Sequence, residues 1–194
     1  MTALRKFVLL AAIVASAPAA AKWTTQAPAA TRVAGALTVT PASADWNRYS
    51  RKPIKKAEIW SLDGPALNTL EFLGGIASGE PLAREIDKKR QPLPKFAADM
   101  KATDVADMIE RTLRATEHTP DVVLSSIEPA DFAGHKGFRL RYRYTVDELT
   151  KLAECRGAIV AGRLYLIAYS APATYYFEAG LPKAQAIMDS AKIG

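Results

Sequence analysis

Three arginines at alternate positions form the most regular pattern of charged side chains in this sequence. The stretch FRLRYRYTV, residues 138–146, sets Arg139, Arg141 and Arg143 between apolar residues. Alternate residues of a strand share one face of a sheet and lie about 6–7 Å apart, so these guanidinium groups would form a basic stripe. The stripe could hold phosphate or carboxylate groups through paired N–H donors. Alternatively, each arginine pairs with a carboxylate on a neighbouring strand and the face is only solvated.

Two further groups of basic residues lie in segments that have no apolar period. Their members are Lys88, Lys89 and Arg90 in one segment, and Arg51, Lys52, Lys55 and Lys56 in the other. Charge runs in loops are mostly solvated. They would also allow the protein to associate with an anionic lipid or polymer surface, and such binding would weaken as salt is added. Both interpretations remain open.

The residue types needed for conventional catalysis are scarce in this chain. It has two histidines, His118 and His135, and one cysteine, Cys155, so neither a nucleophile–base pair nor a zinc site is expected. The segment GGIASGEP, residues 74–81, lacks the spacing of an esterase elbow, a phosphate loop or a dinucleotide fingerprint. We therefore predict no catalytic residue, no metal and no cofactor. A hydrolase with a non-standard site in the long loop of residues 78–96 remains an alternative.

Three bulky or reactive side chains could have a functional role, but packing in the core is the simpler interpretation for each. Cys155 lies in a predicted strand, where it is expected to be a small buried apolar residue, although a reactive thiol is the alternative. Because it is the only cysteine, no intrachain disulfide can form. Trp46 and Trp60 are expected to anchor the core or a turn rather than to stack on a ligand.

The first residues predict export from the cytoplasm. Arg5 and Lys6 precede the apolar run of residues 7–17, and Ala19 and Ala21 then stand in the small-residue pattern of a signal-peptidase site. The run is shorter than a membrane span requires, so we expect cleavage near Ala21 and a periplasmic or secreted protein without a stable membrane span. An uncleaved anchor is the alternative. No cysteine follows the run for lipid attachment.

The charge of the mature chain is mildly basic. The whole chain carries a formal charge of +6, of which the leader supplies two positive charges, so +4 remains. An excess of this size permits contact with anionic surfaces but does not require a nucleic-acid partner. Since export separates the protein from nucleic acid, we expect no such partner.

The elements that must position these residues follow from periodicity. Residues 22–33 are rich in Ala, Thr and Pro and are expected to be a flexible lead-in, and residues 34–194 a single domain. Alternation predicts strands near residues 35–41, 57–62, 67–73, 122–132 (broken near Pro129), 138–146, 153–161 and 163–171. Apolar spacing of three and four predicts helices near residues 103–116, capped by Thr103, and 173–192.

This order of elements predicts the fold class. Short turns connect successive strands, so the sheet should be mostly antiparallel, with about six to seven strands packed between helices in an α+β sandwich. The strand at residues 163–171 is apolar on both faces, with Tyr165, Ile167 and Tyr169 on one side and Leu164 and Leu166 on the other. It should therefore lie inside the sheet and be covered on both sides, with its tyrosines serving packing rather than a ligand.

The C-terminal part resembles a known family. The strand ending in GRLYLIAYSAPATYY, which leads into a helix ending in AIMDSAKI, is similar to the close of the PsbP-like family, including its exported DcrB-type bacterial relatives. The order of elements over residues 34–193 is compatible with that family. The resemblance implies an antiparallel sheet between helices and a non-enzymatic accessory or binding role in the bacterial envelope, with an envelope protein or a small ligand as partner. It implies no catalytic residues.

Overall fold

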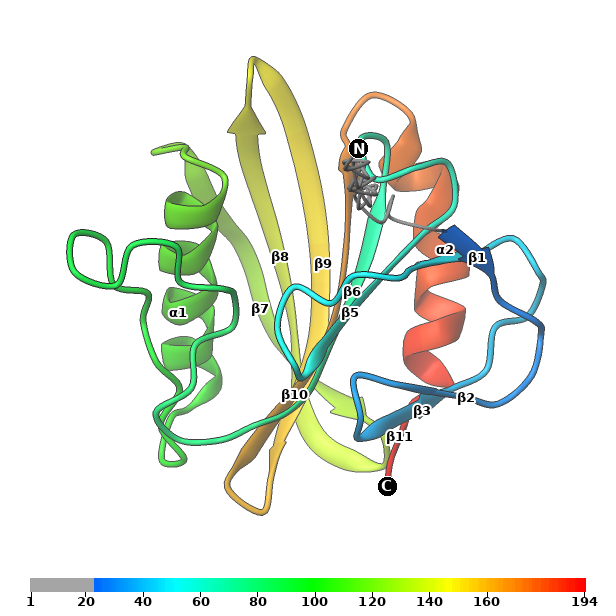
Figure 1. The fold of residues 1–194 in the computed structure, drawn as a ribbon, viewed down its shortest axis with the longest axis horizontal. Coiled ribbons are helices and arrows are strands. Elements are labelled where there is room, and N and C mark those ends of the chain that lie inside the picture. The colour runs from blue at the N-terminus through cyan, green and yellow to red at the C-terminus, as the bar shows by residue number, and fades with distance from the viewer. Residues whose placement is uncertain (1–22) are drawn as a thin grey trace, which may run out of the picture.

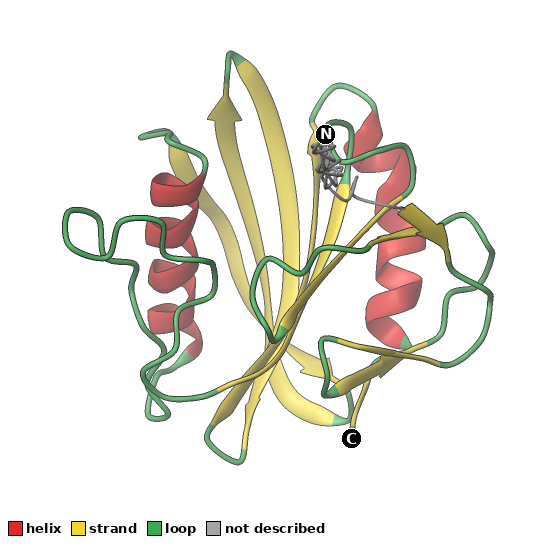
Figure 2. Cartoon of the chain, in the orientation of Figure 1, coloured by secondary structure: helices red, strands yellow, loops and turns green. Residues whose placement is uncertain are grey.

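The computed structural model describes residues 23–194, so the expected signal peptide and its cleavage site lie outside the described residues. The elements of the described range are β1 (Trp23–Thr25), β2 (Thr31–Val33), β3 (Leu37–Val39), β4 (Asn47–Tyr49), β5 (Ala57–Ser61), β6 (Thr69–Ile76), α1 (Ala102–Thr116), β7 (Val122–Phe132), β8 (His135–Val146), β9 (Leu149–Val160), β10 (Arg163–Pro172), α2 (Tyr176–Asp189) and β11 (Lys192–Ile193). They form an α+β fold (Figures 1 and 2).

The main sheet has eight strands in the order β1-β4-β5-β6-β10-β9-β8-β7, and neighbouring strands run antiparallel. The predicted antiparallel arrangement is confirmed, but the predicted six to seven strands are too few. The short strands β1 and β4 lengthen one end of the sheet, and a separate three-stranded sheet has the order β11-β3-β2. Of these short strands, β3 was predicted from its alternation, and the structure confirms it. The strands β1, β2, β4 and β11 carry no clear alternation, so their sequences could not reveal them.

Residues 22–33 were expected to be a flexible lead-in, and the structure differs there. Strand β1 pairs with β4, which brings Trp23 opposite Tyr49 with ring centroids 4.8 Å apart. Strand β2 pairs with β3, and Val33 is fully buried. The order of this segment comes from pairing with strands later in the chain, which a local composition rich in Ala, Thr and Pro cannot indicate.

The two helices cover opposite faces of the main sheet, as Figure 1 shows, with α1 on one side and α2 on the other. We call these the α1 face and the α2 face. The core on the α1 face includes Val105 and Met108 of α1 with Leu140 of β8. The core on the α2 face includes Phe177 and Leu181 of α2 with the small sheet. The α+β sandwich expected from the sequence is therefore present.

Strand β10 lies between β6 and β9 near the middle of the sheet, as its two apolar faces predicted. Leu166 and Ile167 point to opposite faces, and both are buried. Ala161 and Gly162 form the tight turn from β9 to β10 and have φ angles of 49° and 70°. Two successive positive φ angles are the signature of a type I′ hairpin turn, which glycine favours. This hairpin confirms the predicted pairing of the two strands.

The tryptophans and the last helix also match expectation. Trp46 and Trp60 are buried in the core of the α2 face. Helix α2 buries Phe177, Leu181 and Ala184 on the predicted stripe. The structure supports the interpretation that these large side chains serve packing.

Two local expectations were wrong. Helix α1 begins at Ala102, one residue before the predicted cap, because the backbone N–H of Lys101 donates to Asp104 Oδ2 at 2.8 Å and so fixes the first turn. Strand β7 is not broken at Pro129, which pairs with Phe138 of β8. Because β7 is an edge strand, a proline's missing N–H can face away from the ladder without loss.

The described helices were also compared with the length and hydropathy that a bilayer requires. Between residues 23 and 194, no helix is long and apolar enough to cross a membrane.

Candidate functional site

The three arginines of the basic stripe lie on the α2 face of β8, and each is paired with a carboxylate. Arg139 forms an ion pair with Glu128, which stands directly opposite it on β7. Arg141 pairs with Glu154 on β9 at 2.9 Å, and Arg143 approaches Asp121, just before β7, at 3.9 Å. The alternation predicted for β8 is confirmed, since Leu140, between two of the arginines, is fully buried on the other face.

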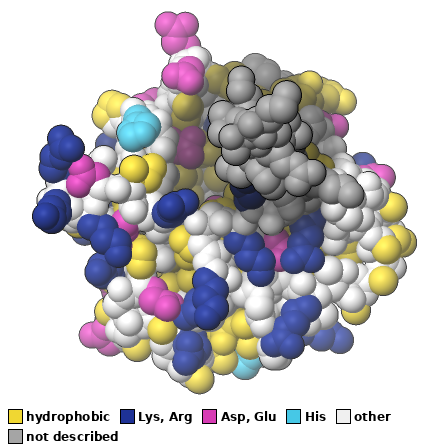
Figure 3. Space-filling view, in the orientation of Figure 1, with side chains coloured by type: hydrophobic (Ala, Val, Ile, Leu, Met, Phe, Trp, Pro, Cys, Tyr) yellow, Lys and Arg dark blue, Asp and Glu magenta, His cyan; other side chains and the backbone are white. Residues whose placement is uncertain are grey.

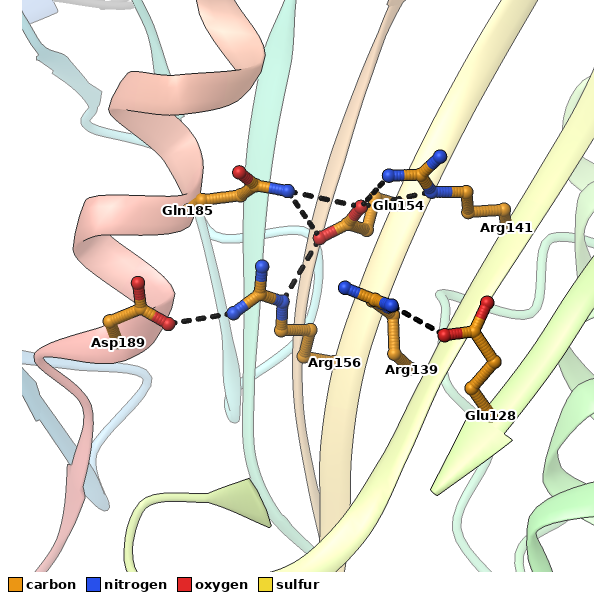
Figure 4. Close-up of polar contacts among 7 residues, drawn as sticks. All are labelled: Glu128, Arg139, Arg141, Glu154, Arg156, Gln185 and Asp189. Carbon is orange, nitrogen blue, oxygen red and sulfur yellow. Dashed lines mark hydrogen bonds and ion pairs between the residues drawn. The ribbon is translucent and has the colours of Figure 1, made fainter. Parts of the chain in front are cut away.

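Glu154 is the centre of these contacts (Figure 4). Its side chain is fully buried and accepts hydrogen bonds from Arg141 Nη2 at 2.9 Å and from Arg156 Nε at 2.9 Å. Gln185 Nε2, from α2, donates to Glu154 Oε1 at 3.0 Å. Arg156 also reaches Asp189 of α2, at 2.7 Å. We call Arg139, Arg141, Arg143, Arg156, their carboxylate partners and Gln185 the arginine network.

The network keeps Glu154 ionised although it is buried. Burial alone would raise the pKa of Glu154, but hydrogen bonds from Gln185, Arg141 and Arg156 outweigh that effect and lower its pKa below the usual value. A carboxylate that is ionised and fully occupied by donors is a poor general acid or base at neutral pH. Glu154 therefore positions the arginines and ties β8, β9 and α2 together.

The outer part of this face is open to solvent. Helix α2 packs over β9 and β10, whereas Arg141 and Arg143 on β8 keep 45% and 47% of their side chains exposed. Val123 of β7, directly opposite Arg143, is 42% exposed. The β8–β9 hairpin also extends beyond both helices at the top of Figure 1. Fixed guanidinium groups with remaining N–H donors on an open face can bind the carboxylates or phosphates of a partner.

The two other basic groups are partly paired and lie mainly in loops. Lys56 donates to Glu80 at 2.5 Å, Arg90 pairs with Asp87 at 2.8 Å, and Lys88 lies 3.7 Å from Glu85. On the face drawn in Figure 3, lysine and arginine side chains are spread over the surface with acidic side chains between them. Such exposed pairs contribute little to stability and leave much of each charge in water.

The loop of residues 78–96 packs beside α1. Leu82, Leu93 and Phe96 are buried and anchor it. A cavity of about 200 Å³ between the loop and the end of α1 contains Asp87 and His118, but Ser78 does not line it. The geometry thus brings no serine to the histidine in this cavity.

Cys155 is buried on the α1 face, where burial raises the pKa of its thiol. A thiol held in the neutral form is unreactive, so the interpretation as a small core residue is supported. Among residues 23–194, no group of three or more His, Cys, Asp or Glu side chains converges in a way that could hold a metal ion.

Sequence reasoning missed the partners that give the stripe its geometry. Glu154 and Arg156 flank Cys155 in the strand AECRG, and this pair of charges at alternate positions in an apolar strand was the available signal. Gln185 and Asp189 lie on consecutive turns of α2, and their distance from β9 in sequence hides the contact. Glu71, in TLEFLGGI of β6, was also missed and is considered below.

Comparison with known proteins supports the fold but assigns no family. No family model matches the chain, and no curated protein matches its sequence. The solution structure of cyanobacterial PsbP (CyanoP) from Synechocystis sp. PCC 6803 matches with a TM-score of 0.51 at 16% identity, covering 95% of this chain and 99% of that one. Residues 23–194 therefore form an α+β fold similar to that of PsbP, with a large antiparallel sheet of eight strands and two helices.

Two further matches are weaker. A crystal structure from Bacteroides thetaiotaomicron has a TM-score of 0.48 at 4% identity and covers 84% of this chain, which spans 47% of that protein's length. The crystal structure of LpqN, involved in cell envelope biogenesis of Mycobacterium tuberculosis, has a TM-score of 0.39 at 12% identity, covering 92% of this chain and 87% of that one. The resemblance to PsbP thus holds for the fold, whereas the DcrB-type relationship stays a prediction.

Proposed function

We propose that this is an exported, non-catalytic binding protein of the bacterial envelope, and that Arg139, Arg141 and Arg143 contact an acidic segment of a partner protein. The observation that carries the proposal is a row of guanidinium groups held by the network on a part of the sheet that α2 leaves open. Export is supported by the charged, apolar and small-residue order of the first 21 residues.

The geometry favours binding because the arginines are already ordered. An arginine that is free in solution loses up to about 2 kcal/mol of side-chain entropy when it is immobilised. Here Glu128 and Glu154 hold two of the guanidinium groups before any partner arrives. Each guanidinium has five N–H donors, and Arg141 spends two groups, Nε and Nη2, on Glu154. Because Arg141 and Arg143 keep 45% and 47% of their side chains exposed, a carboxylate of the partner can reach them.

A protein partner is favoured over a bare anion by the neighbouring apolar surface. Val123 lies opposite Arg143 and is 42% exposed. Protein interfaces typically combine an apolar centre with arginines and a polar rim. An acidic segment with an apolar side chain would satisfy both features of this face.

Site-specific photo-crosslinking in the intact envelope tests the proposal. A photoreactive amino acid is placed at position 123 on the arginine face and, as the matched control, at Ile86, which is 92% exposed on the loop beside α1. We expect a discrete adduct with an acidic protein from position 123 and none from position 86. Equal adducts from both positions, or none from position 123, would contradict the proposal.

A pair of charge variants separates this function from simple adhesion to anionic surfaces. The double substitution Arg139→Gln with Arg143→Gln removes two charges from the face and leaves the Arg141–Glu154 contact in place. Lys88→Gln with Lys89→Gln removes the same charge from the loop. We expect the first to abolish the adduct and the second to leave it unchanged. Loss of the adduct in both double variants would indicate that binding depends on the overall charge of the protein and not on the arginine face.

A further inference from the structure

A second candidate site lies on the other face of the sheet, around Glu71 of β6. Glu71 is paired across the ladder with Ala168 of β10, which is in turn paired with Cys155 of β9. These three residues form the floor of a cavity of about 100 Å³ beneath α1. Its remaining walls are apolar or hydroxyl-bearing and include Leu73, Leu82, Ile109, Thr112, Leu113 and Leu166. The space is several times what one water molecule needs.

Glu71 is half-buried, and it differs from the fully buried carboxylates of the sheet because no residue within 23–194 donates a hydrogen bond to it or pairs with it. Glu58, by contrast, accepts from Trp60 Nε1 and from Arg48, both at 2.8 Å. The hydroxyl groups that line the Glu71 cavity do not help, since Thr112 donates to the carbonyl of Met108 and Thr116 to that of Thr112. A carboxyl group in an apolar pocket costs free energy unless a hydrogen-bond donor or a cation pairs with it.

The charges around the cavity determine which kind of ligand could pair with the Glu71 carboxylate. The cavity is lined by no lysine, arginine or histidine, and Glu117, at the end of α1, adds a second negative charge nearby. The other titratable groups there stay neutral: burial raises the pKa of Tyr144 on β8 to about 12, and it also raises the pKa of the Cys155 thiol. The local potential is therefore negative, which favours a cation and opposes an anion.

We propose that this cavity binds a small organic cation, namely a primary ammonium group on a short apolar stem, with the ammonium donating to the Glu71 carboxylate. The apolar walls would bury the stem, and Thr112 and Thr116 could accept hydrogen bonds that Glu71 cannot. A bare metal ion fits poorly, because the lining offers one carboxylate and a neutral thiol amid apolar side chains. This site is independent of the arginine network, which lies on the opposite face.

The proposal implies that binding releases a proton. Burial, followed by the charge of Glu117, raises the pKa of Glu71 to about 7, so below neutral pH the free carboxyl is mostly protonated. When an ammonium ion binds, that proton leaves Glu71 for the solvent and the carboxylate forms the ion pair. Affinity should therefore rise by up to about tenfold per pH unit until Glu71 is ionised, and then stay constant.

Titration calorimetry with three matched ligands tests the site in the mature protein. n-Butylammonium supplies stem and charge, n-butanol supplies the stem alone, and butyrate carries the opposite charge. We expect saturable binding of n-butylammonium that is at least tenfold tighter at pH 8 than at pH 5, at least tenfold weaker binding of butanol, and none of butyrate. Equal binding of butanol, or the absence of saturable n-butylammonium binding at pH 8, would overturn the proposal.

Two variants locate the binding. Glu71→Gln removes the charge with little change in shape, and Ala168→Leu fills the cavity while keeping Glu71. We expect each to weaken n-butylammonium binding at least tenfold. The control Glu178→Gln removes a carboxylate from the exposed surface of α2 and should bind like the natural sequence. If folded Glu71→Gln, checked by circular dichroism, binds as well as the control, the proposal fails. Ala168→Leu gives an independent result should the first variant unfold.

Discussion

Glu71 and Glu154 lie on opposite faces of one sheet, Glu71 half-buried and Glu154 fully buried, and together they show what decides whether a carboxyl group in the sheet is ionised. Both lie close to β10, where Ala168 is paired with Glu71 and the next residue, Tyr169, is paired with Glu154. Burial raises the pKa of Glu71 to about 7, whereas hydrogen bonds lower the pKa of Glu154 despite its complete burial. The difference lies in partners rather than in depth, since Arg141, Arg156 and Gln185 surround only Glu154.

The contrast between paired and unpaired carboxylates also suits the two faces of the sheet to different kinds of binding partner. On the α2 face, each arginine of the network is paired with a carboxylate, and these carboxylates act as a frame that orders the arginines. On the α1 face, one carboxyl is left unmatched in a cavity. A matched network suits a surface that contacts a large partner, and an unmatched group suits a small ligand that supplies the missing charge. The following predictions test this comparison.

The largest expected effect comes from removing the centre of the matched network. Glu154→Gln takes the negative charge from beneath Arg141 and Arg156, and Arg156 is only 14% exposed. Breaking a buried ion pair by removing one partner typically costs about 3 kcal/mol of unfolding free energy. We expect that loss in urea denaturation at neutral pH.

The matched control for this variant is Asp121→Asn on the same face. Asp121 is 49% exposed and lies 3.9 Å from Arg143. An exposed pair of this kind contributes less than about 1 kcal/mol. If both variants lost the same free energy, Glu154 would not be the centre of the network, and the contrast between the faces would disappear.

The second prediction concerns pH and Glu71. Burial raises the pKa of Glu71 from its usual 4.5 to about 7 in the folded protein. The folded state therefore binds the extra proton, and stability falls as pH rises from about 4.5 to 7. At about 1.4 kcal/mol per pKa unit, reduced because Glu71 is partly exposed, we expect a loss of roughly 2 kcal/mol over that range.

Glu71→Gln should flatten this pH dependence. We expect the variant to match the natural sequence near pH 4.5 and to be more stable at pH 8, as measured by urea denaturation across the range. Glu154 acts in a different window: because its folded pKa is lowered, its contribution is present above the unfolded pKa and is lost as pH falls below about 4.5. Parallel curves for Glu71→Gln and the natural sequence would mean that Glu71 ionises normally in the fold.

The elements of this fold were largely predictable from sequence, but their partners were not. The alternation in β8, the two apolar faces of β10 and the stripe of α2 each follow from a local period that the structure confirms. The strands β1 and β2 carry no such period and exist because β4 and β3 pair with them. Secondary structure that depends on a distant partner leaves little local trace.

The candidate sites show the same limit at the level of side chains. The arginine stripe was visible because alternation puts all three residues on one face of a single strand. Its central partner, Glu154, comes from the next strand, and Gln185 comes from a helix 31 residues later. Glu71 looked like an ordinary polar residue of β6, because its isolation results from the placement of α1 and Leu82 above it. A cavity is defined by several elements at once, so no single stretch predicts it.

The smallest expected effect distinguishes the arginines from one another. Arg141→Gln removes one of the donors to the buried Glu154 and should cost about 1 kcal/mol, because Arg156 and Gln185 remain. Arg143→Gln breaks only an exposed contact at 3.9 Å and should cost less than about 0.5 kcal/mol. Thermal unfolding at low and high salt measures both, and salt should reduce only the Arg143 difference, since exposed pairs are screened. If both variants lost the same unfolding free energy and salt removed both losses, Arg141 would be only a surface charge. Of the arginines, Arg156 alone would then hold Glu154 in place.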